Sequence, residues 1–242
     1  MNAVVGLSLP RAENKTFAGL ALGETLAAKN VSARCAILVI DLRSGDIVEI
    51  RDDETTAAAD GSGPADVNVE HRRIVGITGN TITLDASVKH WMTTANYARV
   101  IKVNPCRNAT IQGASIEFVE PPDSDRINTF QSSLAWKCQY LSCSVPNEDA
   151  YGTRGRAFEL SRCFECDVID CWSGPAKYTG SGEGYGLAFV RSTNCTATRF
   201  TTAGNRHGVS FIGATDCSVR DLRGVGWTNN LVDFHGQREI GC

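Results

Sequence analysis

The chain has 242 residues, of which 21% are charged, and a formal net charge of −3. No run of basic residues stands out, which argues against a protein that binds nucleic acid through phosphate contacts. The longest apolar run, at 35–40, is too short to span a bilayer, and the charged side chains within 1–28 are not typical of a signal peptide. We therefore expect a soluble chain with no membrane span and no nucleic-acid partner.

Two regions precede the repeated part of the sequence. Residues 1–40 are expected to form a cap or attachment segment, because a weak helical stretch at 17–29 would cover the open strand edges of a repeat array. Residues 41–104 form a β-rich lead-in region, in which 52–68 is polar, lacks a periodic apolar face and predicts a surface loop. Alternating apolar residues predict four strands in this region, at 45–50, 73–77, 82–84 and 98–103, with a tight turn at 78–81.

From residue 105 to residue 242 the sequence repeats with a variable period. Steps of 28, 29, 22 and 25 residues separate the anchors Cys138, Cys166, Cys195, Cys217 and Cys242, and Ala109 stands one step earlier. The residue before each anchor is usually polar. Eight residues before the five cysteines stand large apolar residues, namely Phe130, Phe158, Leu187, Val209 and Phe234. Columns that recur together at this period predict an all-β fold, a right-handed parallel β-helix over 105–242 behind a short N-terminal cap region.

The β-helix also accounts for most of the ten cysteines. Coils stack at about 4.8 Å, so the anchor residues form a row through the interior, where a buried thiol acts as a small hydrophobic side chain. Stacked free thiols indicate a reducing compartment during folding. The alternative is a zinc site at Cys163, Cys166 and Cys171, but a second ligand pair at suitable spacing is missing. We predict no metal and no cofactor.

Several segments resemble the pectate-lyase-like β-helix superfamily, notably bacteriophage tailspikes and tail fibres. They are 45–50, 73–85, 108–113, 184–190 and 206–212, and the resemblance covers about residues 40–242. It implies recognition or cleavage of carbohydrate, often by a homotrimer. The leading hypothesis is a tail protein of the virion, assembled in the host cytoplasm with other tail proteins, that binds and in some cases degrades a bacterial surface polysaccharide. The alternatives are a stand-alone polysaccharide lyase, hydrolase or epimerase, and a structural spacer without a ligand.

The best polar cluster lies near the C-terminus. Asp233 and His235 point out of one strand, about 7 Å apart, and we assign them to two solvent-facing stripes that contain Gly208 and Ser210 respectively. Arg206 and His207 precede the equivalent strand one coil earlier. In the catalytic hypothesis, His235 or His207 is the general acid or base, and Asp233 orients it or acts as the second carboxylate. Arg206 neutralises a uronate or a developing negative charge. The alternative is a solvated outer face without catalytic function.

Other side chains offer weaker candidates for a glycan site. Paired carboxylates hydrolyse glycosidic bonds, but the acidic group Glu148, Asp149, Glu159, Asp170 and Glu183 falls on different coils and sides of the predicted helix. Aromatic side chains in or near turns stack on sugar rings, although they equally suit packing beneath the turns. The expected substrate-binding residues are Trp172, Tyr178, Tyr185, Trp227 and Glu159.

Overall fold

The computed structural model describes most of the chain after residue 41. The described residues are 42–52, 68–78, 81–90, 92, 98–117, 128–146, 155–180, 182–236 and 239–242, with the backbone of strands at 3–5, 55–57 and 64–66. Every regular element among them is a β-strand, and they include no helix long and apolar enough to cross a membrane. The helical stretch expected at 17–29 lies outside the described residues.

The lead-in region forms an antiparallel sheet in the strand order β1-β6-β5-β2-β7. All four strands expected from the sequence are present. Val48, Ile74 and Leu84 are buried on one side of this sheet, as the alternating apolar pattern requires. The strands are β1 (Ala3–Val5), β2 (Ile47–Arg51), β5 (Val69–Thr78), β6 (Thr81–Leu84) and β7 (Arg99–Val103).

The segment expected as a surface loop at 52–68 contains regular structure. Strands β3 (Thr55–Ala57) and β4 (Pro64–Asp66) pair as an antiparallel hairpin. Both ends of the segment are buried. There, Nδ2 of Asn68 donates a hydrogen bond to Oδ1 of Asp52 at 3.0 Å. Strands of three residues are too short to give a periodic apolar face, which is why the pattern predicted a loop.

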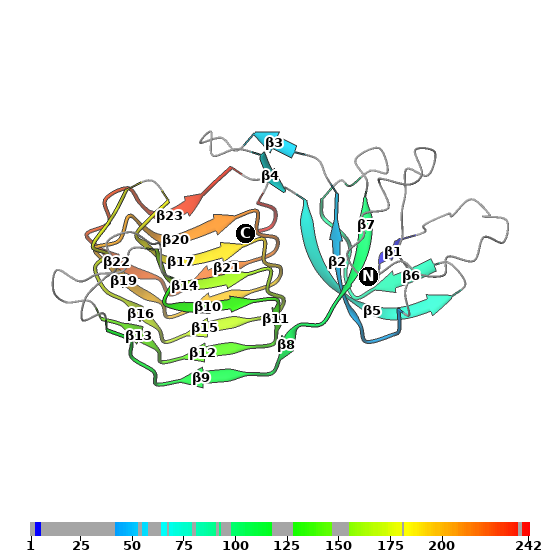
Figure 1. The fold of residues 1–242 in the computed structure, drawn as a ribbon, viewed down its shortest axis with the longest axis horizontal. Coiled ribbons are helices and arrows are strands. Elements are labelled where there is room, and N and C mark those ends of the chain that lie inside the picture. The colour runs from blue at the N-terminus through cyan, green and yellow to red at the C-terminus, as the bar shows by residue number, and fades with distance from the viewer. Residues whose placement is uncertain are drawn as a thin grey trace, which may run out of the picture.

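The remainder of the chain winds into the predicted right-handed parallel β-helix (Figure 1). The large sheet contains β10 (Phe130–Ser133), β14 (Arg156–Ser161), β17 (Tyr185–Val190), β20 (His207–Ile212) and β23 (Asn230–Phe234). The second sheet contains β9 (Thr110–Gln112), β12 (Gln139–Leu141), β15 (Asp167–Ile169), β18 (Thr196–Thr198) and β21 (Ser218–Arg220). The third contains β13 (Ser144–Val145), β16 (Trp172–Ser173), β19 (Thr201–Ala203) and β22 (Arg223–Val225). A short pair, β8 (Cys106–Arg107) and β11 (Ala135–Trp136), completes the first corner.

The cysteine anchors stack as the period predicts. The backbone N–H of Cys138 points at the sulfur of Cys166, and that of Cys166 at the sulfur of Cys195, each at 3.4 Å. The polar residues before the anchors have a structural reason, because each adopts the left-handed conformation that turns the chain at the corner. They are Asn108, Lys137, Glu165, Asn194 and Asp216, with φ between 52° and 55°.

The register of the last strand differs from the prediction by two residues. Val232, not Phe234, lies opposite Val209, and Phe234 lies opposite Phe211. Ten residues separate Val232 from Cys242, whereas eight separate Val209 from Cys217. The longer connection after β23 shifts the strand, so Asp233 pairs with Ser210 rather than with Gly208.

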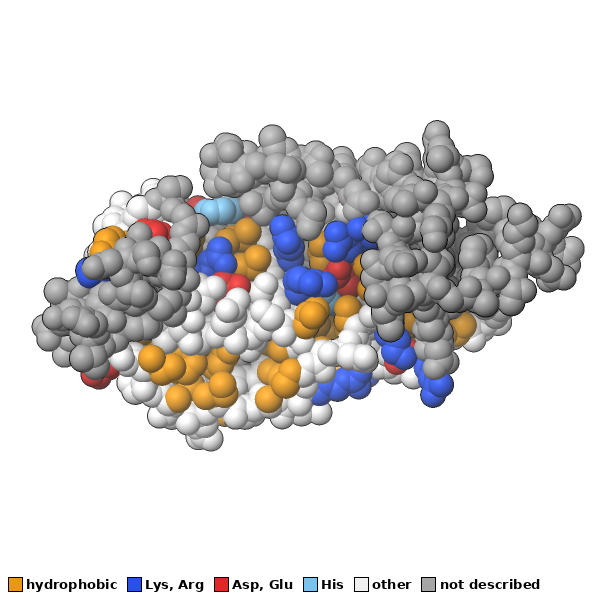
Figure 2. Space-filling view, in the orientation of Figure 1, with side chains coloured by type: hydrophobic (Ala, Val, Ile, Leu, Met, Phe, Trp, Pro, Cys, Tyr) orange, Lys and Arg blue, Asp and Glu red, His pale blue; other side chains and the backbone are white. Residues whose placement is uncertain are grey.

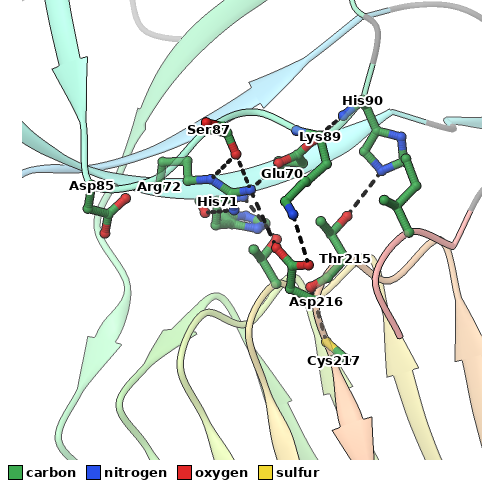
Figure 3. A network of polar contacts seen from close by, with 12 residues as sticks. Glu70, His71, Arg72, Asp85, Ser87, Lys89, His90, Thr215, Asp216 and Cys217 are labelled. Atoms are coloured by element: carbon green, nitrogen blue, oxygen red, sulfur yellow. Dashed lines mark hydrogen bonds and ion pairs between the residues drawn. The ribbon is translucent and has the colours of Figure 1, made fainter. Parts of the chain in front are cut away.

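The antiparallel sheet lies beside the coils and is joined to one of their corners by polar contacts (Figures 1 and 3). Nε2 of His90 lies 3.0 Å from Oγ1 of Thr215, and Nζ of Lys89 lies 3.7 Å from Oδ1 of Asp216. The N–H of His71 donates to Oγ1 of Thr193 at 3.0 Å. Figure 2 shows Lys and Arg side chains gathered on the face where the coils meet this sheet.

Candidate functional site

The candidate site lies on the large sheet and contains a column of four residues from successive coils. Arg156, Tyr185, His207 and Asn230 stand at equivalent positions on successive coils. The rings of Tyr185 and His207 are stacked, with centroids 5.1 Å apart and planes inclined by 26°. Each of these two residues is only 1% exposed. The stack therefore forms the floor of the cluster.

A second column runs beside the first, through Glu159, Ala188, Ser210 and Asp233. These positions were expected to face solvent, but the first three are buried. Neighbouring side chains fold over them: Oγ of Ser210 donates to Oδ2 of Asp233 at 2.9 Å. Glu159 forms an ion pair with Arg156 and accepts hydrogen bonds from neighbouring amides. The stripe therefore contains two separate polar clusters, one at Glu159 and one at Ser210 and Asp233, with the buried Ala188 between them.

Asp233 contacts His235, which lies one residue beyond the end of β23. Oδ2 of Asp233 lies 2.5 Å from Nδ1 of His235. Burial alone would raise the pKa of the Asp233 carboxyl, but hydrogen bonds from Ser210 and His235 and the nearby His207 hold it below its usual value. Asp233 is therefore a carboxylate at neutral pH.

His207 is the buried polar side chain in this cluster that lacks hydrogen bonds. Neither of its ring nitrogens has a hydrogen-bond partner among the residues that the structure describes, and Nδ1 lies 3.8 Å from Oδ1 of Asp233. Burial lowers the pKa of His207, and repulsion from Arg206 and His235 lowers it further, against the attraction of Asp233. A neutral imidazole offers one donor and one acceptor, and the described residues engage neither of them.

Two arginines flank the ring of Tyr185. The guanidinium carbon of Arg156 lies 5.5 Å from the ring centroid, and that of Arg206 lies 6.0 Å from it. Nη1 of Arg206 also donates to the carbonyl of Gly180 at 3.0 Å, which fixes its direction. These cations are within the range in which a positive charge interacts with an aromatic face.

The structure brings together six of the nine residues that the sequence nominated. They are Asp233, His235, His207, Arg206, Tyr185 and Glu159. Arg156 was missed, although its position one coil before Tyr185 follows from the repeat. The prediction paired Ser210 with His235 rather than with Asp233, because it placed β23 two residues out of register.

The other three nominated residues lie on different parts of the coils. Trp172 belongs to β16 in the third sheet. Trp227 is 42% exposed in the turn before β23. Tyr178 precedes β17, and the Nζ of Lys177 lies 5.2 Å from its ring centroid. Among the described residues, these three aromatic side chains thus belong to three different segments of the coils.

The acidic group considered for glycoside hydrolysis is not assembled among the described residues. Asp170 forms an ion pair with Arg199 at 2.5 Å at a corner of the second sheet, away from Glu159. Glu148 and Asp149 lie outside the described residues. Within the described part of the chain, no group of three His, Cys, Asp or Glu side chains is arranged to hold a metal ion.

Comparison with known proteins relates the fold to phage tailspikes. No family model and no curated protein sequence matches the chain. The tailspike gp61 of Pseudomonas phage phi297 is similar with a TM-score of 0.57 and 19% identity, over 79% of this chain and 29% of that one. The tailspike gp49 of Pseudomonas phage LKA1 is similar with a TM-score of 0.52 and 15% identity, over 80% and 32% respectively. The chain thus spans about a third of their length, and the likeness shows a shared fold.

Proposed function

We propose that this chain acts in a bacteriophage tailspike or tail fibre and recognises a bacterial surface polysaccharide. The fold shared with two tailspikes supports this proposal. The observation that carries it is the buried His207, stacked on Tyr185 and facing Asp233, whose two ring nitrogens have no hydrogen-bond partner within the described part of the chain. A buried polar group without partners costs free energy, and a ligand that supplies those partners recovers it.

The chemistry of the cluster suits a sugar. A hydroxyl group donates one hydrogen bond and accepts others, so it satisfies both His207 and the carboxylate of Asp233. Arg206 supplies a fixed cation that would attract an acidic substituent. A binding site of this kind needs a few placed polar groups beside aromatic surface, and the cluster contains both.

A second candidate function is cleavage of the bound polysaccharide. The contact between Asp233 and Nδ1 of His235 favours it, because a carboxylate that orients an imidazole is a common arrangement for proton transfer near neutral pH. The reaction would be that of a polysaccharide lyase or glycoside hydrolase. The pectate-lyase-like resemblance supports the same two classes, and it equally supports a stand-alone enzyme.

Binding is tested on a panel of purified bacterial surface polysaccharides. We expect the Asp233→Asn variant to bind the recognised glycan roughly 10-fold or more weakly than the wild type, because it loses a charged acceptor. The control is Asp170→Asn, which makes the same chemical change in the exposed ion pair with Arg199. Equal binding by the wild type and the Asp233→Asn variant would contradict the proposed site.

Cleavage is tested by assaying the bound glycan for new reducing ends and unsaturated uronates. We expect the double variant Asp233→Asn, His235→Ala to produce neither. Binding by the wild type without products would leave recognition as the function. A spacer would neither bind nor cleave.

Oligomeric state tests the wider proposal of a homotrimeric tail protein of the virion that assembles in the host cytoplasm. Light scattering coupled to size exclusion should give three times the 26.0 kDa mass of the chain. A stable monomer would favour the stand-alone enzyme.

A further inference from the structure

We infer that Tyr185 is a positioning residue that holds the ring of His235 through a hydrogen bond at Nε2. The Tyr185 hydroxyl lies 3.4 Å from Nε2 of His235, on the side of the ring opposite to Asp233. His235 is thus held at both ring nitrogens, by a carboxylate on one and a phenol on the other. This inference rests on the proposed function, because it concerns how His235 would exchange a proton with a bound glycan.

The location of the proton on His235 follows from its partners. The Asp233 carboxylate can only accept a hydrogen bond, so Nδ1 of His235 must carry a hydrogen. In the neutral ring, Nε2 therefore has the free electron pair. The Tyr185 hydroxyl can donate to that pair, and the 3.4 Å separation makes this a long and weak hydrogen bond.

A hydroxyl is the side-chain group that suits both protonation states of His235. It donates to Nε2 when the ring is neutral, and it rotates to accept from Nε2–H when the ring is protonated. In the proposed step the long contact from the Tyr185 hydroxyl to Nε2 is released, a proton passes from the glycan to the freed electron pair of Nε2, and the electron pair of the broken bond stays on the glycan. The charge gained by the imidazole is balanced by the adjacent Asp233 carboxylate, which itself keeps its protonation state.

Local backbone geometry and packing place the ring of Tyr185. Gly184 directly before it has a φ of +72°, and a Cβ at that position would lie 2.3 Å from the carbonyl oxygen of Tyr178. This sharp turn therefore requires glycine. The ring is then held between His207 and Arg156, and it meets the ring of His235 edge-on at a centroid distance of 6.0 Å.

The test is a Tyr185→Phe variant, which keeps the ring and its stacking and removes only the hydroxyl. Nitrogen-15 NMR of the histidine rings reports both the tautomer and the hydrogen bond at Nε2 without any glycan. We expect the Nε2 signal of His235 to shift in Tyr185→Phe while Nδ1 stays protonated. On a cleaved glycan, we expect kcat to fall roughly 10- to 100-fold with KM changed less than about two-fold.

The matched control is Tyr140→Phe. Tyr140 is also buried, and its hydroxyl lies 2.8 Å from Oγ of Ser132 in the same coils. It should leave the His235 signals and kcat unchanged. A second variant, Asp233→Asn, removes the fixed acceptor and should move part of the proton population from Nδ1 to Nε2.

Two results would overturn the inference. One is an Nε2 signal that is the same in the wild type and in Tyr185→Phe, and the other is an equal loss of kcat in Tyr140→Phe. Failure of the proposed function looks different. The wild type would then leave every glycan in the panel unbound, while the Nε2 shift in Tyr185→Phe would still show the contact between Tyr185 and His235.

Discussion

The ring of Phe211 lies stacked on that of Phe234 in the next coil, with centroids 5.0 Å apart and planes inclined by 11°. Phe211 is 2% exposed, whereas Phe234, on the last strand of the large sheet, is 55% exposed. Removing Phe211 opens a cavity inside the coils, so we expect Phe211→Ala to lower the free energy of unfolding by about 3–5 kcal/mol. Phe234→Ala makes the same change and should cost less than half as much. Urea unfolding measures both, and equal costs would contradict the observed register.

The contact between Arg162 and Glu49 joins the coils to the antiparallel sheet. Nε of Arg162 donates to Oε2 of the buried Glu49 at 2.8 Å. Arg162→Ala leaves this carboxylate with fewer partners, and we expect a loss of roughly 2–3 kcal/mol in the free energy of unfolding, because an uncompensated buried charge is costly. The control is Arg199→Ala, which breaks an exposed pair and should change stability little. A similar effect of both variants would count against the buried pair.

Glu49 also predicts how stability depends on acid pH. Burial alone would raise the pKa of Glu49, but the hydrogen bonds and charges of His71 and Arg162 lower it to about 2. A carboxyl with a lowered pKa stabilises the folded state above its ordinary pKa, and this contribution is lost as the pH falls from about 4.5 towards 2. In Glu49→Gln, stability should fall less over that range than in the wild type. Parallel pH curves for the two proteins would refute this assignment.

His207 predicts a second pH dependence, near pH 6. Its pKa is lowered by burial, so the unfolded chain binds a proton at this residue more readily than the folded chain does. The wild type should therefore lose stability as the pH falls below the ordinary histidine pKa of about 6.5. His207→Phe keeps an aromatic ring against Tyr185 and should weaken this dependence. Thermal unfolding at pH 7.5 and pH 5.5 measures the difference, and no change in slope would exclude His207 as its source.

Thiol labelling tests the interior row. Cys106 and Cys242 are exposed, whereas Cys138, Cys143, Cys163, Cys166, Cys171, Cys195 and Cys217 are buried. Among the described cysteines, we expect iodoacetamide to label Cys106 first in the native protein, and Cys242 more slowly, because partial burial of its sulfur raises the pKa of the thiol to about 12. Hydrogen bonds from Cys163 and Cys195 lower the pKa of the Cys166 thiol, yet the coils should protect it. Peptide mass spectrometry identifies the labelled sites. Labelling of Cys166 as fast as Cys106 would mean that the coils open readily.

The candidate site could be predicted in part. Asp233 and His235 stand two residues apart, so the sequence placed them on one side of a strand, about 7 Å apart. In the structure Nδ1 of His235, one residue beyond the end of β23, lies 2.5 Å from Oδ2 of Asp233. The partner of Asp233 in the neighbouring coil could not be predicted from the period. The connection after β23 is two residues longer than the period suggested, and it places Asp233 beside Ser210. The burial of the cluster was also unpredicted. It arises in part from side chains one coil away, such as Asn128 and Gln131, whose amides donate hydrogen bonds to Glu159.

The sequence by itself determined the repeat, the apolar and cysteine rows and the corners, because each depends on residue type at a fixed local spacing. The left-handed residue before each anchor and the stacked sulfurs of Cys138, Cys166 and Cys195 follow from that pattern. Only the tertiary structure decided which polar side chains meet. Stacking at about 4.8 Å makes residues from different coils neighbours, and the lengths of the connections set their register. Tyr185 thereby reaches His235 across 50 residues of chain.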